Sequence, residues 1–164
     1  MNFFTSFFIF YWLRRLMNPI AGLVGAVLYS LLSLAPEASG YTIQAEHFIT
    51  FYIAISFFLI SKVYFQKNQE IISPKSRLIS LLVSGFFLGF ALMTKPNALF
   101  FIPAIAFPIL MAYLQEKNIK TFFKDVLTWG VGAAIPVLLL LGIAVMKGAW
   151  TECWYWMVTY PKIM

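Results

Sequence analysis

The chain is a succession of apolar runs separated by short charged or polar breaks, and this pattern leaves few folds open. A helix needs about 20 mainly apolar residues to cross a hydrocarbon core about 30 Å thick. The runs between the breaks are Phe3–Leu13, Leu16–Ala35, Phe48–Val63, Leu78–Thr94, Ala98–Leu114 and Val126–Met146. Since the last five have the length to cross, the sequence predicts an all-α, polytopic transmembrane helix bundle with about five full spans.

The first run, Phe3–Leu13, is too short to reach across a membrane. It does not have the pattern of a signal peptide, because Arg14 and Arg15 follow the apolar residues and no small-residue cleavage site is present. We expect a truncated N-terminal helix here. The connections between runs, such as Gln66–Arg77 and Gln115–Asp125, are short. Residues 1–164 are therefore expected to form a single membrane domain with no soluble domain.

The composition excludes the other common classes of protein. Apolar residues make up 62% of the chain and charged residues 11%, whereas soluble domains have about 45–50% and about 25%. The single cysteine, Cys153, excludes an intramolecular disulfide. The net charge of +6 does not indicate a nucleic-acid partner, because the charges punctuate the apolar runs and form no basic face. Membrane lipids are the surroundings that this composition predicts.

The basic residues set the expected orientation, because cytoplasmic loops carry an excess of Lys and Arg. Alternation of the spans places nine of the twelve basic residues on one side. These are Arg14, Arg15, Lys62, Lys67, Lys75, Arg77, Lys117, Lys120 and Lys124. Lys95, Lys147 and Lys162 fall on the other side, and the six acidic residues divide equally. The sequence thus predicts a multi-pass protein whose Arg14–Arg15 loop is cytoplasmic.

The first candidate functional residue is Glu46, at the outer start of the run Phe48–Val63. A carboxylate in the first turn of a helix is stabilised by the helix dipole, by about 0.3–1 kcal/mol, and this structural role is one interpretation. The other is a carboxylate that faces an outer cavity and holds a substrate hydroxyl, a cation or a proton in transfer. His47, which follows it, is interpreted first as an interfacial polar residue.

The second candidate is Lys95, in the stretch Thr94-Lys95-Pro96-Asn97. It lies between two apolar runs on the outer side, against the bias of the other basic residues. A lysine can stabilise a helix C-terminus and extend to the lipid headgroups. The alternative is that Lys95 binds a lipid phosphate as a point charge, held in place because Pro96 opens the next helix.

Two further stretches are distinctive, although their ordinary interpretations are structural. The segment from Trp150 to Tyr160 is rich in Trp and Tyr, which gather at membrane interfaces; the alternative is a stacking platform for a sugar or an isoprenoid chain. The GxxxG motif at Gly85–Gly89 predicts close packing of helices within the bundle. A phosphate-binding glycine loop and an HExxH motif are absent from the sequence, and one histidine and one cysteine cannot form a Cys/His metal site. No metal-binding residue is predicted.

Together these stretches resemble the membrane-embedded GT-C glycosyltransferases. The resemblance rests on Ala45-Glu46-His47-Phe48 before a span, on the GxxxGxAxxTKPxA pattern from Gly85 to Ala98, and on the aromatic stretch ending in Tyr160-Pro161. The branch it points to is related to dolichyl-phosphate-mannose protein mannosyltransferases and to bacterial lipid A aminoarabinose transferases. The match runs over nearly the whole chain.

The resemblance implies a hexosyl or pentosyl transferase of the bacterial inner membrane, with a polyprenyl-phosphate-linked sugar as donor and a lipid, glycan or protein hydroxyl as acceptor. It implies that Lys95 contacts the donor phosphate and that Glu46 is the acidic residue of the second outer loop. Candidate contacts to substrate or lipid are His47, Asn97, Trp154, Tyr155 and Tyr160. The resemblance names no required cofactor and leaves a divalent metal open.

The chain departs from the family pattern in one respect. Members place their principal acidic motif in a long outer loop between the first two spans, and nothing upstream of Phe3 supplies that loop. They also carry further spans or a periplasmic domain after the region that ends here at Met164. We therefore expect an internal piece of a glycosyltransferase that is catalytically incomplete.

Two alternatives stay open from the sequence: a transporter fragment, and a small non-catalytic membrane protein. A transporter is expected to carry charges inside its spans, whereas the runs given above leave all charged residues at their ends or in the connections. A non-catalytic membrane protein would need neither Lys95 nor the polar outer connection Pro36–His47.

Overall fold

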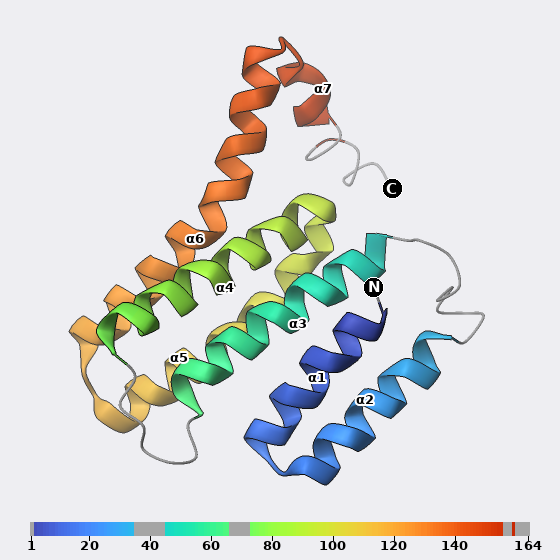
Figure 1. The fold of residues 1–164 in the computed structure, drawn as a ribbon. Helices are drawn as coiled ribbons and strands as arrows, with labels where there is room; N and C mark the ends of the chain where they lie inside the picture. Colours follow the sequence, from blue (N-terminus) through green and yellow to red (C-terminus); the bar gives the residue numbers. More distant parts are fainter. Residues whose placement is uncertain (1, 35–44, 66–72, 156–158, 160–164) are drawn as a thin grey trace.

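The computed structural model describes residues 2–34, 45–65, 73–155 and 159, and every regular element in these ranges is helical (Figure 1). The α-helices are α1 (Asn2–Leu16), α2 (Pro19–Ser33), α3 (Ala45–Tyr64), α4 (Pro74–Thr94), α5 (Ile102–Glu116), α6 (Ile119–Met146) and α7 (Trp150–Trp154). A 3-10 helix, η2 (Pro96–Phe101), precedes α5. The all-α prediction is confirmed.

Among the residues that the structure describes, four helical segments are long and apolar enough to cross a membrane: α3, α4, the combined segment Pro96–Gln115, and α6. Within the expected span Leu16–Ala35, Leu16 ends α1, and α2 covers 15 residues, a length of about 22 Å at 1.5 Å per residue. The late start of α2 has a local cause. Pro19 opens the helix, and Asn18 Oδ1 accepts a hydrogen bond from the Ala21 backbone N–H at 2.8 Å.

The start of α6 corrects the expected connection Gln115–Asp125. Lys117 adopts a left-handed conformation with φ 52° and ends α5. The next residue, Asn118, accepts a hydrogen bond from the Thr121 backbone N–H and caps α6, which begins at Ile119. Asp125 consequently lies inside a membrane-spanning helix and is buried, not in a loop.

Helix α4 packs between α3 and α6, while α1 packs against α2 and α3 (Figure 1). The largest fully buried apolar side chains come from α3, α4 and α5, and are Ile60, Leu81, Leu88, Ile105 and Ile109. The turn between α1 and α2, the end of α3, and the starts of α4 and α6 gather at one end of the bundle (Figure 1). We call it the basic end, because Arg14, Arg15, Lys62, Lys75, Arg77, Lys117, Lys120 and Lys124 lie in these parts.

The contact between α4 and α6 depends on glycine. A Cβ added at Gly85 would collide with the backbone of Trp129, and one at Gly89 would collide with Ala133 and Pro136. From the other side, a Cβ at Gly132 would collide with the Leu82 carbonyl. The two backbones therefore touch directly, which confirms the packing role predicted for the GxxxG motif.

Polar side chains join α4 to α3 inside the bundle. Ser56 Oγ and Ser84 Oγ lie 2.8 Å apart and are fully buried, and Ser84 Oγ donates to the Ser56 carbonyl at 3.0 Å. Both hydroxyls find partners within the protein, as a water-free environment requires.

Substitution of Gly85 tests the contact between α4 and α6. We expect Gly85→Leu to lower the free energy of unfolding by about 1–3 kcal/mol or more, because the added side chain must push the two backbones apart. The measurement is unfolding by titration with sodium dodecyl sulfate from a mild detergent. Gly130→Leu is the matched control, since nothing lies within 4 Å of a Cβ at Gly130. Equal stability of the two variants would contradict the contact.

Candidate functional site

Glu46 and Lys95, which lie 49 residues apart in the sequence, form an ion pair. Lys95 Nζ donates a hydrogen bond to Glu46 Oε1 at 2.5 Å. Glu46 lies in the first turn of α3 and Lys95 is the C-terminal cap of α4. Because α3 and α4 are sequential, packed neighbours of opposite direction, the start of one lies beside the end of the other. The structure thus brings together the two residues that the sequence analysis selected separately.

The position of Lys95 follows from the proline after it. A residue before proline is driven out of the α region by the proline ring, and Lys95 is extended, with φ −160° and ψ 129°. Its backbone N–H still donates to the Ala91 carbonyl at 3.1 Å, which closes the last turn of α4. The side chain is therefore fixed at its root where the helix ends.

The ion pair is also favourable to both helices and open to its surroundings. Glu46 faces the positive end of the α3 dipole, and Lys95 the negative end of the α4 dipole. Each residue therefore lies where it stabilises the end of its own helix, which is the structural role considered for it in the sequence analysis. The side chains remain 54% and 44% exposed, respectively. A ligand can reach both charged groups from outside the bundle.

The other predicted site residues near the ion pair differ in exposure. Asn97 lies in η2 two residues after Lys95 and is exposed. His47 is buried, 9% exposed, although it follows the exposed Glu46. The structure therefore places Asn97 at the surface beside the lysine and His47 within the bundle.

The aromatic candidates lie on another element. Trp154 and Tyr155 follow the end of α6 at α7 and are exposed. The Trp154 ring packs on the Trp150 ring, with their centroids 5.9 Å apart. Within the described residues, this is the ring contact that Trp154 makes. Tyr160 lies outside the described residues. The structure therefore does not join Trp154 to the Glu46–Lys95 pair.

A second charged cluster was missed by the sequence analysis. At the basic end, Arg77 Nη2 contacts Asp125 Oδ2 at 2.5 Å, and Tyr64 Oη donates to the same oxygen at 2.6 Å. The Arg77 guanidinium lies 5.3 Å from the centre of the Tyr64 ring. The sequence did hold one signal that Asp125 lies inside a helix. Asn118 is a residue type that caps helix starts, and it lies two turns before Asp125.

No group of three or more His, Cys, Asp or Glu side chains that could hold a metal ion occurs in the part of the chain that the structure describes.

A double-mutant cycle on Glu46→Gln and Lys95→Gln measures what the pair contributes to folding. We expect a coupling free energy of about 0.2–1 kcal/mol, because exposed ion pairs are solvated in the unfolded state and hold two long side chains in place. The free energies of unfolding of the two single variants and of the double variant supply the cycle. A coupling free energy above about 2 kcal/mol would contradict this expectation and show that the main role of the pair is to stabilise the fold.

The model of the dolichyl-phosphate-mannose-protein mannosyltransferase family matches residues 1–145, which include α1 to α5 and almost all of α6. Neither the curated proteins nor the solved structures give a significant match. The match covers the Glu46–Lys95 pair and both ends of the bundle. The chain belongs to the dolichyl-phosphate-mannose-protein mannosyltransferase family, and is an integral membrane protein of glycosyltransferase type.

Proposed function

We propose that the Glu46–Lys95 pair is part of the site where this chain binds the phosphate of a polyprenyl-phosphate-linked sugar, for transfer of the sugar to an acceptor hydroxyl. The observation that carries the proposal is the ion pair itself, an exposed lysine fixed at the end of a membrane helix beside an exposed carboxylate. Family membership supports lipid-linked sugar transfer in general.

Lys95 is the group that binds the phosphate in this proposal. The donor of such a reaction keeps its prenyl chain in the hydrocarbon and its phosphate at the level of the headgroups, where the end of a spanning helix also lies. In the transfer, the bond between the sugar carbon C1 and the phosphate oxygen breaks, and its electron pair stays on that oxygen. A lysine ammonium beside the phosphate stabilises the charge that develops there.

Glu46 has two successive roles in this proposal. Without donor it neutralises Lys95. When the phosphate takes its place beside the lysine, the carboxylate is released to hold the acceptor hydroxyl and to help accept its proton as the new carbon–oxygen bond forms. The donor phosphate and Glu46 thus compete for one ammonium group.

The proposal also orients the protein. The Glu46–Lys95 pair lies at the end of the bundle opposite the basic end (Figure 1). We propose that the basic end is cytoplasmic, so that transfer takes place at the outer face of a bacterial inner membrane, with a hexose or pentose as the sugar.

Protection from heat by polyprenyl phosphate tests the assignment. We expect the lipid to raise the melting temperature of the wild type in detergent and to lose most of this effect in Lys95→Gln. The matched control is Lys147→Gln, an exposed lysine at the C-terminal cap of α6. Glu46→Gln should bind the lipid at least as tightly as the wild type, because the competing carboxylate charge is removed.

Each variant gives a different answer. Protection of Lys95→Gln equal to that of the wild type sinks the assignment of Lys95 to the phosphate. Weaker protection of Glu46→Gln overturns the competition and indicates that the carboxylate contributes to donor binding directly.

A further inference from the structure

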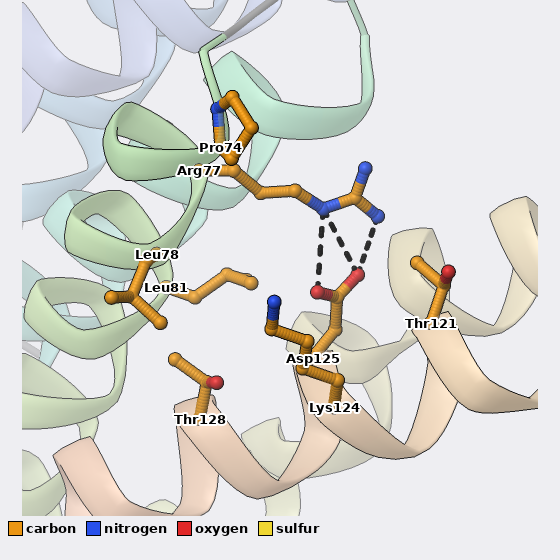
Figure 2. Close-up of a pocket in the computed structure, with 8 residues that line it drawn as sticks. All are labelled: Pro74, Arg77, Leu78, Leu81, Thr121, Lys124, Asp125 and Thr128. Atoms are coloured by element: carbon orange, nitrogen blue, oxygen red, sulfur yellow. Dashed lines mark hydrogen bonds and ion pairs between the residues drawn. The ribbon is translucent and has the colours of Figure 1, made fainter.

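A pocket of about 130 Å³ opens between the starts of α4 and α6 (Figure 2). It lies at the basic end of the bundle, whereas Glu46 and Lys95 lie at the start of α3 and the end of α4. By the share of volume that water takes in the liquid, it has room for about four water molecules. The residues that line it are Pro74, Arg77, Leu78 and Leu81 of α4, and Thr121, Lys124, Asp125 and Thr128 of α6.

The charges of Arg77 and Asp125 compensate each other. Arg77 Nη2 and Nε both contact the carboxylate, at 2.5 Å and 3.2 Å from Oδ2, as the dashed lines in Figure 2 show. Tyr64 donates a further hydrogen bond to this carboxylate from α3. Since the pair is neutral as a unit, the remaining charge of the pocket is the ammonium of Lys124.

Lys124 forms no ion pair with a carboxylate in the described residues and is exposed. The hydroxyls of Thr121 and Thr128 make no hydrogen bond within the same part of the chain. These residues lie at spacings of three and four along α6, so they share one face of the helix. That face therefore presents one cation and two partly exposed hydroxyl groups that have no hydrogen-bond partner within the described residues.

The pocket also lies where negative charge is favoured and where apolar chains can approach. The starts of α4 and α6 both contribute the positive ends of their dipoles. On the α4 side, Leu78 and Leu81 form an apolar wall, and Leu78 is 41% exposed. A free anion gains nothing from such a wall, whereas a phospholipid presents a phosphate and an acyl chain together.

We propose that this pocket binds the headgroup of an anionic phospholipid, with its phosphate on Lys124 and its polar headgroup on the hydroxyls of Thr121 and Thr128. A zwitterionic lipid fits less well, because its ammonium group meets Lys124 while the Asp125 carboxylate is already occupied by Arg77 and Tyr64. The site is independent of the proposed donor site, since it uses neither Glu46 nor Lys95.

Native mass spectrometry of the purified chain tests the proposal, with phosphatidylglycerol, phosphatidylcholine and inorganic phosphate added in separate experiments. A lysine near an anionic surface contributes about fivefold to lipid affinity wherever it lies. We therefore expect Lys124→Gln to weaken phosphatidylglycerol binding at least about fivefold beyond the matched control Lys120→Gln. Lys120 lies one turn earlier on α6, is exposed, and does not line the pocket.

The double variant Thr121→Val with Thr128→Val keeps every charge and should weaken the binding of phosphatidylglycerol as well, because it removes only the hydroxyls.

Three outcomes would contradict the proposal. An equal loss of phosphatidylglycerol binding in Lys124→Gln and Lys120→Gln overturns the pocket in favour of a diffuse basic surface. Equal binding of phosphatidylcholine overturns the selection for negative charge. Displacement of phosphatidylglycerol by an equal concentration of inorganic phosphate overturns the lipid as ligand and assigns the pocket to free phosphate. None of these outcomes depends on whether Lys95 binds a sugar donor.

Discussion

The direct backbone contact of α4 with α6 is the interaction on which the rest of the structure depends. In a bilayer, apolar side chains gain little by leaving lipid for protein, so helices associate through close packing and internal hydrogen bonds. Gly85, Gly89 and Gly132 let α4 and α6 approach until backbone meets backbone. On its other side, α4 is joined to α3 by the buried hydroxyls of Ser56 and Ser84. These contacts fix α4 from both sides, and its two ends carry the two polar clusters described above.

The two clusters differ in what they contribute. The Arg77–Asp125 pair is partly buried, is hydrogen-bonded to a third helix through Tyr64, and leaves little of its charge for a ligand. The Glu46–Lys95 pair is half exposed and joins the start of α3 to the end of α4. A charge that can exchange its partner belongs in the second kind of environment, because the exchange must not leave an unpaired ion in a region of low dielectric constant. Helix α4 thus carries a partly buried ion pair with α6 near its start and an exposed ion pair with α3 at its end, and the proposed function assigns the exchange of partners to the exposed pair.

The sequence determined most of the helices, because apolar runs of membrane length are a strong local signal. Where prediction and structure differ, short-range capping decides: Asn18 and Pro19 delay α2, and Asn118 starts α6 before its apolar run begins. The selection of Glu46 and Lys95 rested on a carboxylate at a helix start and on a lysine against the charge bias. Their contact could not be deduced from these patterns, since it depends on how far along each other α3 and α4 are aligned. The burial of His47 beside the exposed Glu46 depends on the rotation of α3, which its nearly uniform apolar sequence does not specify.

The glycine contact has a consequence for the order in which the bundle assembles. Helices α3 and α4 follow each other directly in the chain, as do α1 and α2, so each pair forms a hairpin through local contacts. The contact of α4 with α6 is non-local, since η2 and α5 lie between them and Arg77 and Asp125 are 48 residues apart. Contacts between distant parts of a chain form late, because the intervening segment must be ordered first. We therefore expect α6 to dock after the hairpin of α3 and α4 has formed. Until α6 docks, Arg77 and Asp125 cannot form their ion pair, so the segment Pro96–Gln115 and α6 must both be inserted first.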